Sequence, residues 1–333
     1  MAPIHRILRV TGKGLLWLGL LLATSLPAQA ASKPEGKGPR PVGAVNSSNG
    51  GVYKPGQLGF VLKYFYYDQD QLYQGTDKVD FFPPKPGQKP ARKCFQRTVH
   101  KSQLTIRAGL LERFDTRLII PVFDKEMKRS SSTMDFTDDN FGLGDIRLIG
   151  RYQLLSQKRD PLNLALGVGL KMPTGETGAE DDKGNCLPGF LQTGSGSWDP
   201  FFELGAHKVV GRHWFSGHLS YLLTTEGELG ESDFERPDVF NYNLAYALAL
   251  HKLVDLQLEL NGQVKGMARL DGETVANSGG HIVYLTPGLH FKFYKGMHFG
   301  LCVPIAVYHD LNGTQLAENF RIVAKLAIKF NAF

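Results

Sequence analysis

Apolar and polar residues alternate along most of the chain with a period of two, the pattern of a β-strand that has two unlike faces. In residues 161–172, leucines, a valine and a methionine at every second position alternate with small or polar residues. The same alternation recurs at 239–251, 255–268 and 319–330. The pattern therefore predicts an all-β protein whose strands carry one aliphatic face and one polar face.

Repeating this test along the chain predicts about twelve strands. They cover residues 57–68, 97–111, 116–124, 141–155, 161–172, 197–208, 213–224, 239–251, 255–268, 280–293, 298–308 and 319–330. The connections alternate between long segments, such as 69–96 and 173–196, and tight turns, such as 112–115 and 252–254. Strands of about ten residues joined in this alternating way are typical of outer-membrane barrels.

A barrel also explains why one face of each strand is apolar. Backbone polar groups in hydrocarbon must all be hydrogen-bonded, so a sheet that spans a membrane has to close on itself. We therefore expect residues 57–333 to form a transmembrane antiparallel β-barrel of about twelve strands, with the polar faces lining the lumen. A soluble, exported β-sandwich is the alternative fold.

The N-terminal residues are predicted to lie outside this barrel. Residues 1–30 combine a basic start, the apolar run Leu15–Leu22 and an A-x-A site at Ala28–Ala30, which predicts a cleaved signal peptide for export through the Sec pathway. Residues 31–56 are rich in glycine, proline and small polar residues and are predicted to be a flexible leader.

Composition and charge narrow the classes of function. No apolar run reaches the roughly 18 to 20 residues of a transmembrane helix, so the sequence argues against a helical membrane protein. Removing the signal peptide removes three of the 38 Lys and Arg residues and none of the 32 acidic ones, so the net charge falls from +6 to 35 − 32 = +3. A charge this small and this dispersed argues against a nucleic-acid partner.

Export changes how the three cysteines are interpreted, because an oxidising compartment permits disulfides. Cys94 and Cys186 both fall in predicted connections, whereas Cys302 falls inside an apolar strand pattern. A Cys94–Cys186 disulfide with Cys302 as a buried thiol is one pairing that this arrangement allows.

The polar faces of the predicted strands carry many more cations than carboxylates. A lumen that holds water or paired charges explains them, since charged groups in a membrane-spanning strand must face water or each other. Two hypotheses follow: a basic pore wall that attracts anionic solutes, or ion pairs that fill a closed interior. The residues are Lys63, Lys101, Arg107, Arg117, Arg147, Arg151, Lys171, Lys265, Lys292, Arg321, Lys325 and Lys329, against Asp145, Glu203 and Glu259.

Patterns that would indicate an enzyme, a metal site or a cofactor are weak. His218 and Ser220 share a strand face, and an outer-membrane lipase could combine such a pair with an asparagine such as Asn241 or Asn243. Histidine and serine are common on a polar face, however. The acidic residues in 176–182 lack EF-hand spacing. We expect no enzymatic activity, no metal and no cofactor.

The second half of the chain resembles a known family. The segments Phe141–Leu148 (FGLGDIRL), Gly169–Gly175 (GLKMPTG) and Gly194–Asp199 (GSGSWD) are similar, in this order, to strand openings and endings of the MetA-pathway of phenol degradation family. Near the C-terminus, three further segments fit the final hairpin of that family: Thr286–Leu289, Val303–Ile305 and Asp310–Gln315.

The resemblance implies an outer-membrane barrel that helps hydrophobic or aromatic compounds to enter the cell. Aromatic carboxylates or fatty acids would reconcile that role with the basic polar face. The alternative is a structural or surface-binding barrel with a closed lumen. The expected partners are outer-membrane lipid, a small-molecule solute and the barrel assembly machinery, which reads a C-terminal strand such as the one that ends at Phe333.

Overall fold

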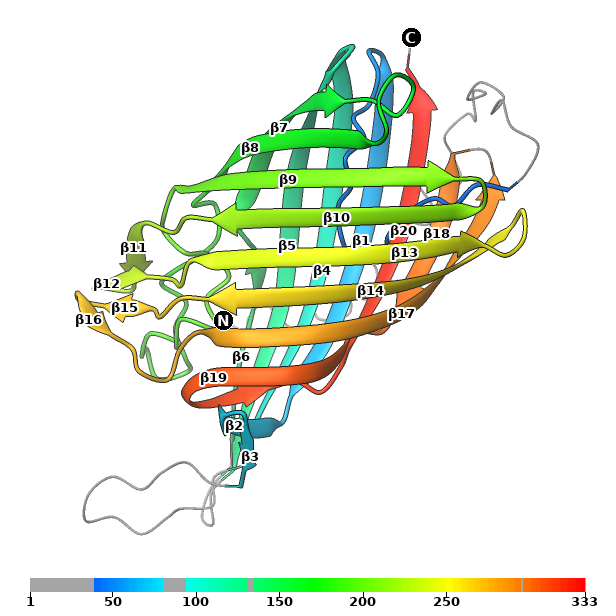
Figure 1. Ribbon diagram of the computed structural model, residues 1–333. Helices are drawn as coiled ribbons and strands as arrows, with labels where there is room; N and C mark the ends of the chain where they lie inside the picture. The colour runs from blue at the N-terminus through cyan, green and yellow to red at the C-terminus, as the bar shows by residue number, and fades with distance from the viewer. Residues whose placement is uncertain (1–38, 81–93, 131–134, 295, 333) are drawn as a thin grey trace.

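The computed structural model describes residues 39–80, 94–130, 135–294 and 296–332, and these form a closed antiparallel barrel of twelve strands with short extra strands (Figure 1). β1 (Gln57–Gln69) pairs with β20 (Arg321–Asn331) on one side and with β4 (Cys94–Leu111) on the other, so the first and last strands close the sheet. The predicted architecture and strand number are confirmed. None of the described residues belongs to a helix long and apolar enough to cross a membrane.

The other barrel strands pair with their neighbours in chain order. They are β5 (Phe114–Ser130), β6 (Asp135–Leu143), β7 (Ile146–Leu155), β8 (Asn163–Met172), β9 (Asp199–Val210), β10 (His213–Leu222), β13 (Val239–Ala249), β14 (Val254–Lys265), β17 (Gly280–Tyr294), β18 (Met297–Cys302) and β19 (Ile305–Ala317). Short strands lie in the long connections: β2 (Gln71–Gly75), β3 (Asp77–Val79), β11 (Glu226–Leu229), β12 (Ser232–Glu235), β15 (Arg269–Leu270) and β16 (Glu273–Thr274).

The two ends of the barrel differ, as the alternating connections predict. At one end, toward the top and right of Figure 1, strands are joined by tight turns such as the one between β9 and β10. At the other end, the long connections carry a small sheet of β11, β12, β15 and β16. We call these the tight-turn end and the long-loop end.

Prolines explain two places where one barrel strand is split into two elements. β5 pairs with β7 up to Ile119 and with β6 from Val122 onward, which leaves Pro121 at the break. β17 likewise pairs with β19 up to Leu285 and with β18 from Gly288, so Pro287 lies at the second break. Proline has no N–H to donate to a neighbouring strand. The expected single strand 141–155 is therefore two strands, and so is 298–308.

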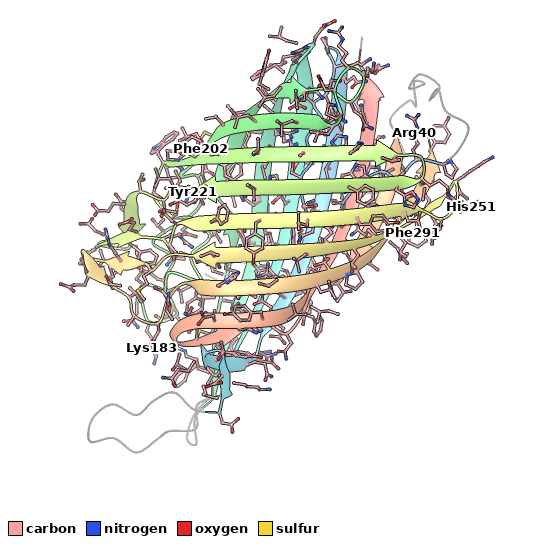
Figure 2. All side chains as sticks on the ribbon, viewed as in Figure 1. Arg40, Lys183, Phe202, Tyr221, His251 and Phe291 are labelled. Atoms are coloured by element: carbon pink, nitrogen blue, oxygen red, sulfur yellow. The ribbon has the colours of Figure 1, made fainter. Side chains whose placement is uncertain are left out.

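The two faces of the strands separate as the alternation predicts. On β8, Leu166, Val168 and Leu170 point outward and are exposed, while Ala165 and Lys171 point inward and are buried. Aromatic rings such as Phe202 and Tyr221 add to the outer surface (Figure 2). The interior is polar instead of apolar, because its fully buried side chains include many charged groups, among them Asp115, Arg151, Asp255, Glu259 and Glu318.

The segment before the first strand differs from the expected flexible leader. Residues 39–56, which we call the strap, lie inside the lumen, and Ala44 and Val45 are buried there. The strap is held by long-range hydrogen bonds, such as the one from the Val45 N–H to Glu259. The remaining leader residues, 31–38, and the predicted signal peptide, 1–30, lie outside the described residues.

Candidate functional site: the lumen, its strap and its cap

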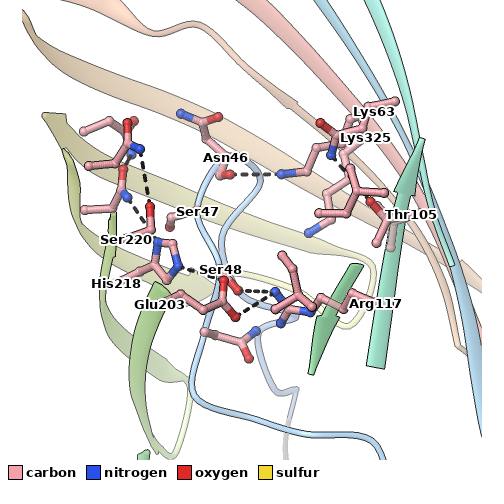
Figure 3. Close-up of a pocket in the computed structure, with 18 of the residues that line it drawn as sticks. Asn46, Ser47, Ser48, Lys63, Thr105, Arg117, Glu203, His218, Ser220 and Lys325 are labelled. Atoms are coloured by element: carbon pink, nitrogen blue, oxygen red, sulfur yellow. Dashed lines mark hydrogen bonds and ion pairs between the residues drawn. The ribbon is translucent and has the colours of Figure 1, made fainter. Parts of the chain in front are cut away.

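The strap enters the lumen from the tight-turn end, where Arg40 and His251 both lie (Figure 2) and where Lys292 donates to the Arg40 carbonyl. Its middle residues, Asn46 to Ser48, lie among inward-facing side chains of the barrel wall (Figure 3). It then returns toward the tight-turn end, where the Gln57 N–H donates to the Lys54 carbonyl as β1 begins. The strap is therefore a re-entrant loop in the lumen.

Carboxylates of the barrel wall hold the strap by its backbone N–H groups. Glu259, which is fully buried on β14, accepts from the N–H groups of Val45, Asn46 and Ser47 at 2.9–3.0 Å. At the two ends of the strap, Asp255 accepts from Val42 N at 2.9 Å and Asp115 accepts from Tyr53 N at 2.7 Å. Hydrogen bonds to ionised acceptors are roughly twice as strong as neutral ones, so these carboxylates anchor the strap.

Cations of the wall hold the same segment by its carbonyl groups. Lys63 donates to Asn46 O at 2.9 Å and Lys325 donates to Ala44 O at 2.8 Å. Arg151 donates to the carbonyls of Asn49 and Gly51. Many charges that the sequence indicates as a pore wall thus bind the chain itself.

The cations that the sequence predicts to face the lumen fall into two groups. In the first group, a cation has a carboxylate within ion-pair distance: Arg107 with Asp115, Arg117 and Arg151 with Glu203, Lys171 with Asp145 and Asp199, Lys292 with Asp255, and Arg321 with Glu318. In the second group, among the described residues, no carboxylate lies within ion-pair distance; these cations are Lys63, Lys101, Arg147, Lys265, Lys325 and Lys329. Glu259 binds the strap.

A second segment closes the lumen toward the long-loop end. Residues 187–194 of the β8–β9 connection, which we call the cap, are held by Lys125 and Arg236. Lys125, which is buried on β5, donates to the carbonyls of Phe190 and Gln192 at 2.9 and 2.7 Å. Arg236 also donates to the Gln192 carbonyl and to those of Gly189 and Gly194, and the Arg97 guanidinium lies 3.8 Å from the centre of the Phe190 ring. Leu187 and Leu191 pack against Met127 of the wall.

The lumen retains open space between these two segments. A central cavity of about 390 Å³ lies against strap residues Asn46 to Asn49. An outer cavity of about 360 Å³ lies beneath the cap and is lined by Phe190, Lys125 and Lys265. Gln263 lines both cavities. A third space of about 820 Å³ opens at the tight-turn end.

One wall of the central cavity consists of amides and hydroxyls. Asn241 donates to Ser220 Oγ at 3.3 Å, and the Asn261 amide donates to Asn243 at 2.8 Å. His218 bonds Glu203 and Asn243, each at 3.3 Å, and not Ser220 (Figure 3). The histidine and the hydroxyl are therefore parts of a hydrogen-bonded wall and do not form a nucleophile–base pair.

Several residues of the site were not singled out in the sequence. Asp115, Asp255, Glu318 and Arg236 hold the strap, the wall or the cap. The alternation could have placed Asp115 and Asp255, since both lie at strand ends on the polar face. The strap has no periodic pattern, and nothing local in its sequence indicates that distant carboxylates bind it.

The predicted Cys94–Cys186 disulfide stays a prediction. The Cys186 thiol is free and exposed in the structure, and the Cys94 side chain lies outside the described residues. Cys302 is buried as expected and packs with Val45 and Val323. Among the described residues, no group of three or more His, Cys, Asp or Glu side chains is arranged to hold a metal ion.

One solved structure aligns well enough to show the same fold, and two others align more weakly. An outer membrane channel from Pseudomonas putida F1 aligns with a TM-score of 0.65 and 15% identity, over 86% of this chain and 100% of that chain. The β domain of the Bordetella autotransporter BrkA aligns at 0.44 and 10% identity, over 83% and 100% of the two chains. A Pseudomonas aeruginosa FadL homologue aligns at 0.40 and 10% identity, over 83% and 90%.

A search of curated proteins finds no match in sequence. A family model described as "Putative MetA-pathway of phenol degradation" matches residues 95–326. This range contains every motif on which the resemblance in the sequence rests. Because the match covers well over half of the chain, the protein belongs to this family of β-barrels.

Proposed function

We propose that this protein is an outer-membrane channel through which small hydrophobic compounds enter the cell, and that the structure describes its closed state. The aliphatic outer surface of the closed barrel supports a place in the membrane, since such a surface would be unfavourable in water. The membership of a family linked to phenol degradation supports a hydrophobic or aromatic solute.

The observation that carries this proposal is the space enclosed in the lumen. The central cavity, of about 390 Å³, borders the strap, the outer cavity, of about 360 Å³, borders the cap, and Gln263 lines both. A barrel with only a structural role could fill its interior with side chains, as small barrels do. Here two separate segments close a lumen that is otherwise open, which favours a pathway that opens when they move.

The location and the assembly partners belong to the same proposal. The predicted signal peptide would direct export through the Sec pathway, and the last strand would be recognised by the barrel assembly machinery. Phe333 lies outside the described residues. We also propose that the protein is not an enzyme.

Uptake by whole cells tests the proposed function. A deletion strain should take up radiolabelled phenol, toluene or benzoate more slowly than the same strain complemented with the gene. Complementation with a gene that lacks residues 1–30 controls for export, because its product stays out of the membrane. Equal uptake of all these compounds with and without the protein would contradict a role in import.

The alternative is a sealed barrel with a structural or surface-binding role. The strap and the cap favour it, because both segments are bound to the barrel wall inside the lumen. Conductance in planar bilayers separates the two. A channel shows openings that variants of the strap or cap increase, whereas a sealed barrel stays silent at every voltage in all of them.

A further inference from the structure

Two lysines face each other directly across neighbouring strands in the lumen. Lys63 on β1 and Lys325 on β20 are register partners, and both line the central cavity. Residues paired in this way have Cβ atoms about 4.5–5.5 Å apart, and like charges there are destabilising. Each ammonium group donates to one strap carbonyl, so each retains further N–H donors on the cavity side.

The cavity as a whole carries more positive than negative charge. Its lining includes six cations, Lys63, Arg107, Arg117, Arg147, Arg321 and Lys325, and one carboxylate, Glu203. Three of the cations have carboxylate partners; among the described residues, Lys63, Arg147 and Lys325 have none. Glu259 acts on both lysines electrostatically, but its oxygens accept the strap N–H groups.

Arg147 is the clearest unpaired donor. Among the described residues it has no hydrogen-bond or ion-pair partner, although Asp145 and Glu203 act on it electrostatically from beyond ion-pair distance. Its guanidinium carbon lies 6.0 Å from the centre of the Phe201 ring. A guanidinium has five N–H donors in a fork that fits a carboxylate. The hydroxyl of Ser47 is a second unused group: it is buried at the cavity wall and has no hydrogen-bond partner among the described residues.

Apolar side chains lie beside these donors. Phe65, Ile119, Ile149 and Phe201 line the same cavity. The volume, about 390 Å³, exceeds the roughly 150 Å³ that accommodates benzene in an engineered protein cavity. The cavity therefore has room for one aromatic ring and an anionic group, with water around them.

We infer that the central cavity is a binding site for a small aromatic or aliphatic carboxylate, whose anionic group is held by Arg147, Lys63 and Lys325 and whose hydrocarbon part packs on Phe65 and Phe201. This inference rests on the proposed channel function and specifies the solute class. A carboxylate would relieve the repulsion between the two lysines, which a neutral phenol would not.

Isothermal titration calorimetry on the full chain in detergent micelles tests the site. Benzoate is expected to bind at least tenfold more tightly than benzyl alcohol, which has the same ring and no charge. Arg147→Gln and Lys63→Gln are each expected to weaken benzoate binding at least tenfold and to leave benzyl alcohol binding unchanged. Lys63→Gln keeps an amide that can donate to the strap, and Arg147 contacts no strap atom, so neither change removes an anchor outright.

Lys183→Gln is the matched control, because Lys183 is an exposed lysine of the β8–β9 connection. Heat-modifiable gel mobility verifies that each variant is folded. Equal affinity for benzoate and benzyl alcohol, absence of benzoate binding, or unchanged binding in Arg147→Gln would overturn the site. Benzoate binding without any difference in cellular uptake would instead contradict the channel function and leave the site in place.

Discussion

Glu259 is the residue on which the position of the strap depends most. Its carboxylate oxygens accept hydrogen bonds from three consecutive backbone N–H groups. In glutamine, an NH2 group replaces one of these oxygens, so a donor would face the N–H groups in place of an acceptor. Glu259→Gln is expected to weaken the attachment of the strap by about 2 kcal/mol, the scale of a hydrogen bond to a charged group. In hydrogen exchange, protection of residues 45–47 should then fall roughly 30-fold, since 1.4 kcal/mol is a factor of ten.

Glu273→Gln, at an exposed carboxylate of β16, is the control for this change. Protection of the barrel strands should be the same in both variants. Unchanged exchange of the strap in Glu259→Gln would show that the carbonyl contacts from Lys63, Lys325 and Arg151 suffice to hold it.

Glu318, in the connection between β19 and β20, gives the long-loop end a pH-dependent stability. Burial alone would raise the pKa of Glu318, but the Arg321 guanidinium and hydrogen bonds from Gln69 and Tyr284 lower this pKa to about 2. Because the folded pKa lies below the ordinary glutamate value of 4.5, the stabilisation is present above pH 4.5. It is lost as the pH falls toward 2.

The difference between wild type and Glu318→Gln isolates this contribution from other carboxylates. In urea unfolding followed by tryptophan fluorescence, the variant should be less stable by on the order of 3 kcal/mol at pH 7, and the difference should shrink between pH 4.5 and 2. A difference that is the same at pH 7 and pH 2.5 would mean that Glu318 acts through shape and neutral hydrogen bonds.

For single residues, the sequence predicts which way a side chain faces but not what it binds. Period-two alternation is enough to turn Arg151 and Glu203 into the lumen, because the register of a strand fixes its faces. It does not reveal that Arg117 and Arg151 share one carboxylate, since those pairs join β5, β7 and β9. Such partners depend on how the barrel closes.

At the level of the elements, the strap packs so closely against the barrel wall that a methyl group added to the wall would displace it. A Cβ atom added at Gly205 of β9 would lie 2.7 Å from the Asn49 carbonyl oxygen. Because this oxygen belongs to the backbone, the strap itself would have to shift to remove the clash. Gly205→Ala is expected to push the strap away and cost about 1–3 kcal/mol, with increased hydrogen exchange at residues 49–51. Gly217→Ala, on the lipid-facing side of β10, meets nothing closer than 3.7 Å and should leave exchange unchanged. Equal exchange in both variants would contradict this close approach.

The elements also show where prediction from sequence stops. Strand positions follow from alternation, and the breaks opposite Pro121 and Pro287 follow from the missing N–H of proline. The strap could not be found in this way, because its glycines and small polar residues are also typical of a flexible segment. Its conformation is fixed by residues about 210 positions away, such as Glu259 and Asp255.

For the whole molecule, the strap and the cap are two closures in series along one lumen. The strap is anchored by residues such as Glu259 and Lys325, whereas the cap is anchored by Lys125 and Arg236. The two closures share no anchoring residue among the described contacts. Each can therefore be loosened without the other, and ions must pass both to cross the barrel.

This arrangement predicts conductance that is strongly non-additive. Lys125→Met removes the two hydrogen bonds from Lys125 to the cap, and Glu259→Gln loosens the strap. Each variant alone should raise conductance in planar bilayers little, because the remaining closure limits the current, while the double variant should exceed the sum of both increases several-fold. Lys128→Met with Glu273→Gln, two exposed positions, is the matched double control. If one single variant already conducts as well as the double, only one segment closes the lumen; if none conducts, the barrel is sealed by its wall.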